Sequence, residues 1–140
     1  MQQILLHIDL IAKIENLERL IETVSTCARN QGFNPKRIGE IELTVEEAFV
    51  NICRYSYPEE PGKVEIKCKL DANRFIIEIT HFGIPFDMKL LSSPNVTADI
   101  DQRKVGGLGV FLIKKFTDEV NYHRENDRNI LNLIVNKDEE

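Results

Sequence analysis

The sequence has little of what marks a membrane protein, a secreted protein or a nucleic-acid-binding protein. No apolar stretch approaches the length that spans a bilayer, and the start, MQQILLHIDL, lacks the charged beginning of a signal peptide. The formal net charge is -5 over 140 residues, and no Lys/Arg block stands out. This charge disfavours a sequence-independent nucleic-acid binder. These absences predict a soluble protein that contacts neither membrane nor nucleic acid directly.

Cysteine is scarce as well. Cys27, Cys53 and Cys68 are an odd number, are widely spaced, and each lies in an apolar pattern. This usage is typical of buried free thiols and predicts a reducing, cytoplasmic location. The cysteines do not combine with His81 and His123 at the spacing of a metal site. The sequence also contains no motif that favours a metabolic enzyme.

The length suits a single domain, 1–140, that buries a core without disulfides. Periodicity and turn residues predict its elements in order. They are a strand at 3–10, a helix from Asn16 to a cap at Gly32, a helix after Asn34, a hairpin of 63–70 with 74–80, a helix after Gly109, and a hairpin of 118–123 with 129–136. The simplest fold that buries the apolar faces of these helices and strands is an α/β two-layer sandwich, with a mixed or antiparallel sheet covered by helices on one face.

The stretch 40–55, EIELTVEEAFVNICRY, predicts the central helix, with Asn34 as N-cap and Pro35 at the first helical position. Its apolar stripe consists of Ile38, Ile41, Val45, Ala48 and Ile52. Its neighbouring polar stripe consists of Glu40, Thr44, Glu47 and Asn51. Glu47 and Asn51 meet on one helix face, where a carboxamide can ligate Mg²⁺ and a carboxylate can orient or deprotonate a nucleophile. A solvated helix flank is the alternative.

Two later stretches carry further signals. Residues 88–105 are polar and aperiodic, which fits either a functional lid or a disordered linker. The glycines of VGGLG at 105–109 precede a helix, so their backbone N–H groups can bind an anion. The stretch lacks the lysine and Ser/Thr of a P-loop, and a plain glycine turn that starts a helix is the alternative.

Three motifs, in order, resemble the nucleotide-binding boxes of the GHKL ATPases. They read Glu47-Ala48-x-x-Asn51, then x-Phe82-Gly83-x-Pro85-Phe86-Asp87, then Gly107-Leu108-Gly109-x-x-Leu112-Ile113. Within this superfamily, the chain is most similar to the anti-sigma-factor serine kinases, which have a histidine-kinase-like ATPase domain. The resemblance covers nearly the whole chain. It implies ATP and Mg²⁺ as cofactors, phosphorylation of a serine on a small antagonist protein, sequestration of a sigma factor, and a tendency to form a homodimer.

The resemblance also implies roles for single residues. Asn51 would ligate the Mg²⁺ that bridges the ATP phosphates, and Glu47 would be the base on the attacking hydroxyl. Gly83 would lie against the adenine, and 88–105 would be the lid. The phosphate-binding residues would be Arg103, Lys104, Gly107, Leu108 and Gly109, with the glycines acting through backbone amides.

This chain departs from the family's pattern in the part of the site that would bind the adenine base. His81 stands where the family has an aspartate that accepts a hydrogen bond from the adenine amino group. An imidazole accepts through one nitrogen and loses that ability on protonation. We therefore expect one of three outcomes: ATP binds about ten- to a hundredfold more weakly, a different nucleotide binds, or none binds. Any ATP binding should weaken further below about pH 6. Ile130 aligns with a family threonine of the last strand, and Tyr55 replaces a family histidine, a change that nothing in the sequence explains.

The sequence is compatible with two functions. The first is an ATP-dependent serine kinase that is also an anti-sigma factor. The second is a binding module of the same fold that holds a sigma factor or antagonist with weakened or lost ATP binding.

Overall fold

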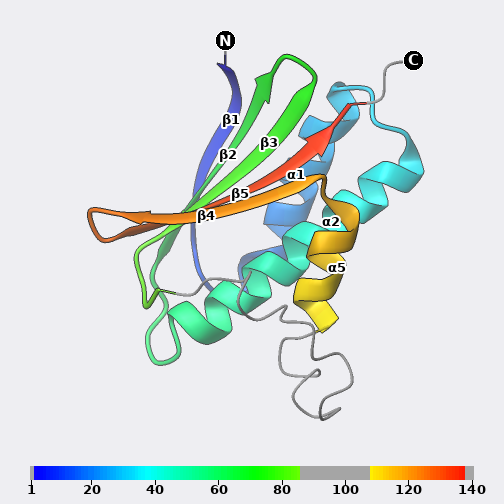
Figure 1. The fold of residues 1–140 in the computed structure, drawn as a ribbon. Coiled ribbons are helices and arrows are strands. Elements are labelled where there is room, and N and C mark those ends of the chain that lie inside the picture. Colours follow the sequence, from blue (N-terminus) through cyan, green and yellow to red (C-terminus); the bar gives the residue numbers. More distant parts are fainter. Residues whose placement is uncertain (1, 86–107, 138–140) are drawn as a thin grey trace.

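The computed structural model describes residues 2–85 and 108–137 (Figure 1). Its elements are β1 (Gln2–Ile11), η1 (Ile14–Asn16), α1 (Leu17–Asn30), α2 (Pro35–Asn51), the π-helix η2 (Ile52–Ser56), β2 (Lys63–Asp71), β3 (Arg74–His81), α5 (Leu108–Phe116), β4 (Glu119–Glu125) and β5 (Arg128–Asn136). The predicted strands, helices and hairpins are confirmed, with small differences at their ends. The predicted lid at 88–105 lies outside the described residues. None of the described helices has the length and apolar character needed to cross a bilayer.

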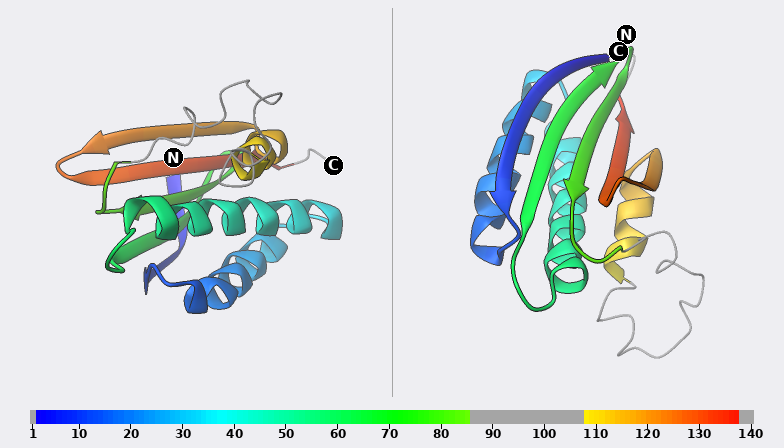
Figure 2. Two further views of the ribbon diagram at one scale, coloured as in Figure 1. Left: turned by 90° about the horizontal axis from the view of Figure 1, so that it is seen from below. Right: turned by 90° about the vertical axis from the view of Figure 1, so that its left-hand side faces the viewer.

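The five strands form one sheet in the order β1-β2-β3-β5-β4, and every neighbouring pair is antiparallel. The predicted α/β sandwich is confirmed, whereas a mixed sheet is wrong, because each strand runs opposite to the neighbour it pairs with. Helices α1, α2 and α5 all lie on one face of this sheet (Figures 1 and 2). The helix-covered face therefore holds the core, as the two-layer prediction requires.

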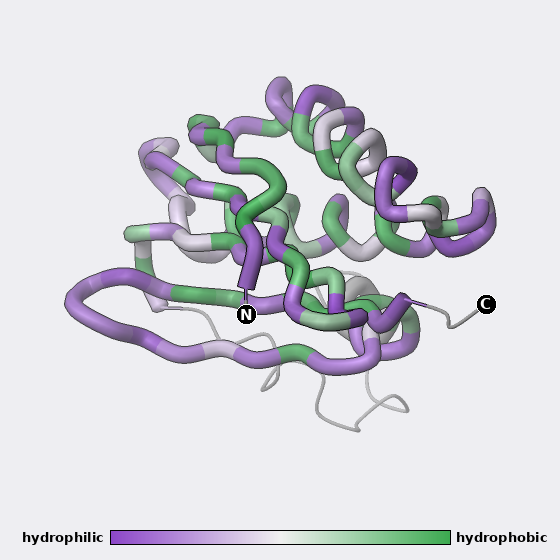
Figure 3. Tube along the Cα trace, turned by 90° about the horizontal axis from the view of Figure 1, so that it is seen from above, coloured by the Kyte–Doolittle hydropathy of each residue, from purple (hydrophilic) through white to green (hydrophobic). Residues whose placement is uncertain are grey.

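The local signals in the sequence explain α2. The Asn34 side chain accepts a hydrogen bond from the Arg37 amide at 2.8 Å, and Pro35 opens the helix, as predicted. The predicted apolar stripe is buried in full: Ile38, Ile41, Val45, Ala48 and Ile52. Hydrophobic segments gather between the helices and the sheet, while the tip of the β4–β5 hairpin is hydrophilic (Figure 3). Burial of this stripe fixes which side of α2 faces the sheet.

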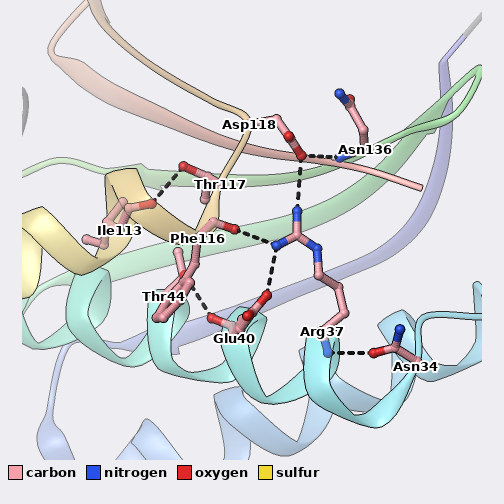
Figure 4. Close-up of polar contacts among 9 residues, drawn as sticks. All are labelled: Asn34, Arg37, Glu40, Thr44, Ile113, Phe116, Thr117, Asp118 and Asn136. Atoms are coloured by element: carbon pink, nitrogen blue, oxygen red, sulfur yellow. Dashed lines mark hydrogen bonds and ion pairs between the residues drawn. The ribbon is translucent and has the colours of Figure 1, made fainter. Parts of the chain in front are cut away.

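A clamp centred on Arg37 holds α5 against α2 (Figure 4). The Arg37 guanidinium pairs with Glu40 at 2.9 Å, donates to the Phe116 carbonyl at 3.2 Å, and pairs with Asp118 at 3.1 Å. The Asp118 carboxylate also accepts a hydrogen bond from the backbone amide of Asn136 at 2.7 Å, which brings the end of β5 into the same cluster. The clamp closes the last turn of α5 and so sets the position of the helix whose first residues continue the glycine motif.

Candidate functional site

The polar stripe of α2 divides into two halves. Thr44 donates its hydroxyl hydrogen to the Glu40 carbonyl at 2.8 Å, and Glu40 pairs with Arg37, so this half serves the helix and the clamp. Asn51, at the end of α2, is only 2% exposed, and Glu47 is partly buried. The stripe is therefore not a solvated flank. Its second half, Glu47 and Asn51, is the part that can serve a ligand.

The surroundings of Glu47 suit a proton acceptor. Burial raises the pKa of its carboxyl, the neighbouring Glu46 carboxylate raises it further, and the Arg54 guanidinium opposes both effects. A carboxylate whose pKa moves toward neutrality is a stronger base and takes a proton from a hydroxyl more readily. The electrostatics agree with the role predicted for Glu47, which stays a prediction.

Three buried polar atoms of the described residues have no hydrogen-bond partner: Asn51 Nδ2, Ser56 Oγ and His81 Nδ1. Such atoms are rare, because each unmade hydrogen bond costs about 1–3 kcal/mol. They come from the end of α2, from η2 and from the end of β3. Asn51 and Ser56 are five positions apart, which is about one turn of a π-helix, a feature often found at functional sites. Each of these atoms has room for one further hydrogen bond, which a polar ligand would supply.

Gly83 follows the end of β3, and its backbone packs against the end of η2. The Ile84 amide donates to the Ser56 carbonyl at 2.9 Å, and the Phe82 amide donates to the Tyr57 hydroxyl at 2.7 Å. A Cβ on Gly83 would lie 2.2 Å from the Ser56 carbonyl oxygen. Only glycine allows this approach of two backbones. Gly83 therefore has a structural role that sequence reasoning missed, and its predicted place against the adenine stays a prediction.

Gly83→Ala is expected to destabilise the protein by about 1–3 kcal/mol, because the added Cβ forces the Ser56 backbone away. Urea unfolding followed by circular dichroism measures this loss. Gly39→Ala is the matched control, since an added Cβ at this exposed position of α2 meets nothing within 4 Å. We expect the control to gain up to about 1 kcal/mol from helix propensity. Equal stability of the two variants would contradict the close approach at Gly83.

Asn129 organises the sheet next to His81. It pairs with His81 across β3 and β5, and its Nδ2 donates to the carbonyls of His81 and Gly83, each at 3.1 Å. Its Oδ1 accepts from the Tyr122 hydroxyl at 2.7 Å and from the Arg124 guanidinium at 2.9 Å. Asn129 thereby fixes the backbone around His81 and brings the Arg124 charge beside it. Sequence reasoning missed this residue.

The strand register corrects the alignment at Ile130. Ile130 pairs with Thr80, and Asn129 pairs with His81. Because side chains alternate between the two faces of a sheet, Ile130 lies on the face opposite to His81. The residue of β5 that pairs with His81 and shares its face is Asn129. Ile130 therefore does not line the same side of the sheet as His81.

His81 is 1% exposed, and burial together with the nearby Arg124 charge lowers its pKa from 6.5 to about 4. Desolvation disfavours the charged imidazolium, and a neighbouring cation does the same. The expected weakening of ATP binding below about pH 6 assumed an unperturbed imidazole, and the lowered pKa moves this prediction to about pH 4. The neutral form persists down to about pH 4.

The pKa of His81 makes folding stability dependent on pH. Because the unfolded chain takes up this proton near pH 6.5 and the folded chain only near pH 4, stability is complete above 6.5 and falls as the pH drops toward 4. The expected loss is about 3 kcal/mol. Urea unfolding of the wild type and His81→Gln across this range isolates it, since all other groups are shared. Parallel curves for the two proteins would show that His81 titrates normally.

The third motif lies partly within the described residues. Leu108 and Gly109 are the first two residues of α5, which confirms that the glycine motif opens a helix. Ile113 is buried, as predicted for the apolar face of this helix. Arg103, Lys104 and Gly107 lie outside the described residues, so their proposed contacts stay predictions. The Arg37 clamp holds the end of α5 against α2, and α5 lies in the same helix layer as α2, which carries Glu47 and Asn51 (Figure 1).

Two grooves of the described surface lie away from these atoms. One of about 560 Å³ is lined by η1, α1 and α2, and another of about 350 Å³ is lined by β1 and α1. Asn51, Ser56 and His81 line neither groove. The candidate site is thus defined by its buried polar atoms.

The sequence profile of the family described as "Histidine kinase-like ATPase domain" matches residues 10–135. The chain belongs to this family. Among similar proteins, the serine-protein kinase RsbW of Bacillus cereus (strain AH820) is 26% identical over 124 residues, which are 86% of this chain and 78% of that protein. The serine-protein kinase RsbW of Listeria monocytogenes serovar 1/2a (strain ATCC BAA-679 / EGD-e) is 24% identical over 121 residues, with 82% and 77% covered.

A chain in the crystal structure of the SiaB-SiaC complex from Pseudomonas aeruginosa has the same fold. It superimposes with a TM-score of 0.69 at 13% identity, over 94% of this chain and 89% of that one. The match confirms the histidine kinase-like ATPase fold predicted from the three motifs. Within this fold, the unpaired polar atoms lie on α2, η2 and β3, and all three elements fall inside the matched range.

Proposed function

We propose that this protein binds ATP with Mg²⁺ at the site formed by α2, η2, the end of β3 and the start of α5, and transfers the γ-phosphate to a serine of a partner protein. The observations that carry the proposal are the buried, unpaired polar atoms on Asn51, Ser56 and His81, and a partly buried Glu47 with a raised pKa one helix turn before Asn51. The family and the relatives named serine-protein kinases support it.

Each residue has a distinct task in this proposal. A half-turn of the Asn51 amide exchanges its oxygen and nitrogen, so its oxygen can face the unpaired position and ligate Mg²⁺. Bound Mg²⁺ supplies charge neutralisation at the phosphates. Glu47 takes the proton of the attacking serine hydroxyl. The start of α5 directs its free amides at the phosphates, and His81 contacts the base.

The partners follow from the resemblance to the anti-sigma-factor serine kinases. In this proposal, the acceptor serine belongs to a small antagonist protein, and the unphosphorylated antagonist competes with a sigma factor for the protein in the cytoplasm. A homodimer is part of the same proposal. The second candidate function is a regulatory binding module of the same fold, which the substitution of His81 at the adenine end favours.

Isothermal titration of ATP into the pure protein with Mg²⁺ separates the two functions. The kinase proposal expects saturable binding of one ATP per chain, weakened by removal of Mg²⁺ with a chelator. The same titration of an antagonist or sigma factor, without nucleotide, tests the binding module. Absence of nucleotide binding together with binding of a protein partner would replace the kinase by the module.

His81→Asp is expected to tighten ATP binding by about ten- to a hundredfold, because a charged acceptor replaces a neutral one. The Arg124 charge that lowers the pKa of His81 would also favour an ionised aspartate at this position. Titration of ATP into both proteins at pH 8 measures the gain. His81→Asn, which offers a neutral acceptor, is the matched control and should change affinity little. Unchanged affinity in the aspartate variant would remove His81 from the base contact.

A further inference from the structure

Three side chains that can ligate a metal ion meet on the face of the sheet that the helices leave open. His7 and Asp9 lie two positions apart on β1, and Glu65 pairs directly with Asp9 across β1 and β2. Ile66, the residue after Glu65, belongs to the core on the helix-covered face. Because side chains alternate along a strand, Glu65, Asp9 and His7 share the opposite face. His7 and Asp9 are exposed, and Glu65 is partly exposed.

The ligand atoms of these three residues are close enough to share one ion. His7 Nε2 lies 3.2 Å from Asp9 Oδ1, and one ligand atom from each of the three residues lies within 4.8 Å of the other two. Two ligand atoms held about 2.1 Å from a tetrahedral ion are about 3.4 Å apart, so His7 and Asp9 already have a suitable separation. The Glu65 carboxylate has to approach by no more than about 1.4 Å, which a change of its side-chain torsions provides.

A cation of the chain itself already lies against the two carboxylates. Lys63 Nζ is 3.8 Å from Asp9 Oδ2 and 3.4 Å from Glu65 Oε2. The Lys63 side chain is 51% exposed, so its ammonium group can turn into solvent. Exposed ion pairs of this kind contribute little to stability. A divalent ion that binds both carboxylates and the His7 imidazole can therefore displace the lysine.

We propose that His7, Asp9 and Glu65 bind a divalent transition-metal ion of the Zn²⁺ type on the open face of the sheet. The imidazole nitrogen favours Zn²⁺ or Co²⁺ over Mg²⁺, which takes oxygen ligands. Three protein ligands leave a fourth position for water on the solvent side. The ion ties the edge strand β1 to β2. It is distinct from the Mg²⁺ proposed with ATP, because α2 and its Asn51 lie on the other side of the sheet (Figure 2).

Isothermal titration of Zn²⁺ into the full chain, without nucleotide, tests the site. We expect saturable binding of one ion per chain. His7→Gln should weaken it at least tenfold, because the imidazole ligand is lost. Lys63→Met should tighten it several-fold, because the competing positive charge is removed. His123→Gln is the matched control, since it removes an exposed imidazole from β4 at the opposite edge of the sheet and should change nothing.

The absorption spectrum of the Co²⁺-loaded chain identifies the ligands. Nitrogen and oxygen ligands give only weak visible bands, whereas strong near-ultraviolet bands would place the ion on the cysteines and overturn the proposal. Equal affinity of His7→Gln and the wild type, or an equal loss in His123→Gln, would also overturn it. Asp9→Asn repeats the test at a second ligand, and circular dichroism checks that each variant is folded. Nucleotide binding is measured separately, by titration of ATP with Mg²⁺, so failure of one proposal leaves the other standing.

Discussion

Glu47→Gln is expected to slow phosphoryl transfer by about a hundred- to ten-thousandfold and to leave ATP affinity nearly unchanged. The substitution keeps the shape of the side chain and removes only the proton acceptor, and loss of a general base typically has this cost. The partly buried position and raised pKa of Glu47 are the structural basis of the expectation. Transfer of labelled γ-phosphate from ATP to an added antagonist protein measures the rate.

Glu46→Gln is the matched control for Glu47. Glu46 is the neighbouring residue on α2, is exposed, and contributes to the raised pKa of Glu47 only through its charge. The control should therefore retain most of the rate. If Glu47→Gln transfers phosphate as fast as the wild type does, Glu47 is not the base. If ATP affinity falls with the rate, its task is binding.

Asn51→Ala is expected to abolish the Mg²⁺-dependent part of ATP binding. The amide is the only side chain of this helix end that the proposal assigns to the metal, and an alanine offers no ligand atom. Stability of the nucleotide-free protein should change by no more than about 1 kcal/mol. The removed amide has an unpaired buried nitrogen, so its loss relieves a cost that offsets the small cavity.

Titration of ATP with and without Mg²⁺, together with urea unfolding, separates these effects. Asn51→Asp keeps an oxygen ligand and should retain Mg²⁺-dependent binding, which makes it the control for the alanine variant. Unchanged Mg²⁺-dependent affinity in Asn51→Ala would exclude the metal role. A large loss of stability would instead show that the amide is a structural element of α2.

The outcome at α2 shows what local sequence encodes. The cap at Asn34, the apolar stripe and the pairing of Glu47 with Asn51 on one face all depend on neighbours within a few positions. Helix periodicity therefore predicted them. The hairpins were predictable for the same reason, since alternation and turn residues lie within one short segment. The three motifs also predicted the family, because they span the chain in a fixed order.

Strand register and the burial of polar side chains were not predictable from the sequence. No sequence pattern singled out Asn129, yet the sheet places it beside His81, 48 positions away in the chain. The pKa of His81 depends on burial by the whole core and on Arg124, so an unperturbed imidazole gave the wrong pH. The tight approach of Gly83 to Ser56 likewise joins segments that no local pattern connects.

The sequence by itself therefore determined the elements, their apolar faces, the two-layer class and the family, because these depend on short-range periodicity and on the order of motifs. Only the tertiary structure decided that the sheet is antiparallel, that Asn129 and not Ile130 shares the face of His81, and that Asn51, Ser56 and His81 bury unpaired atoms. The physical reason is that pairing register and desolvation arise between residues far apart in the chain, and packing of the complete core selects them.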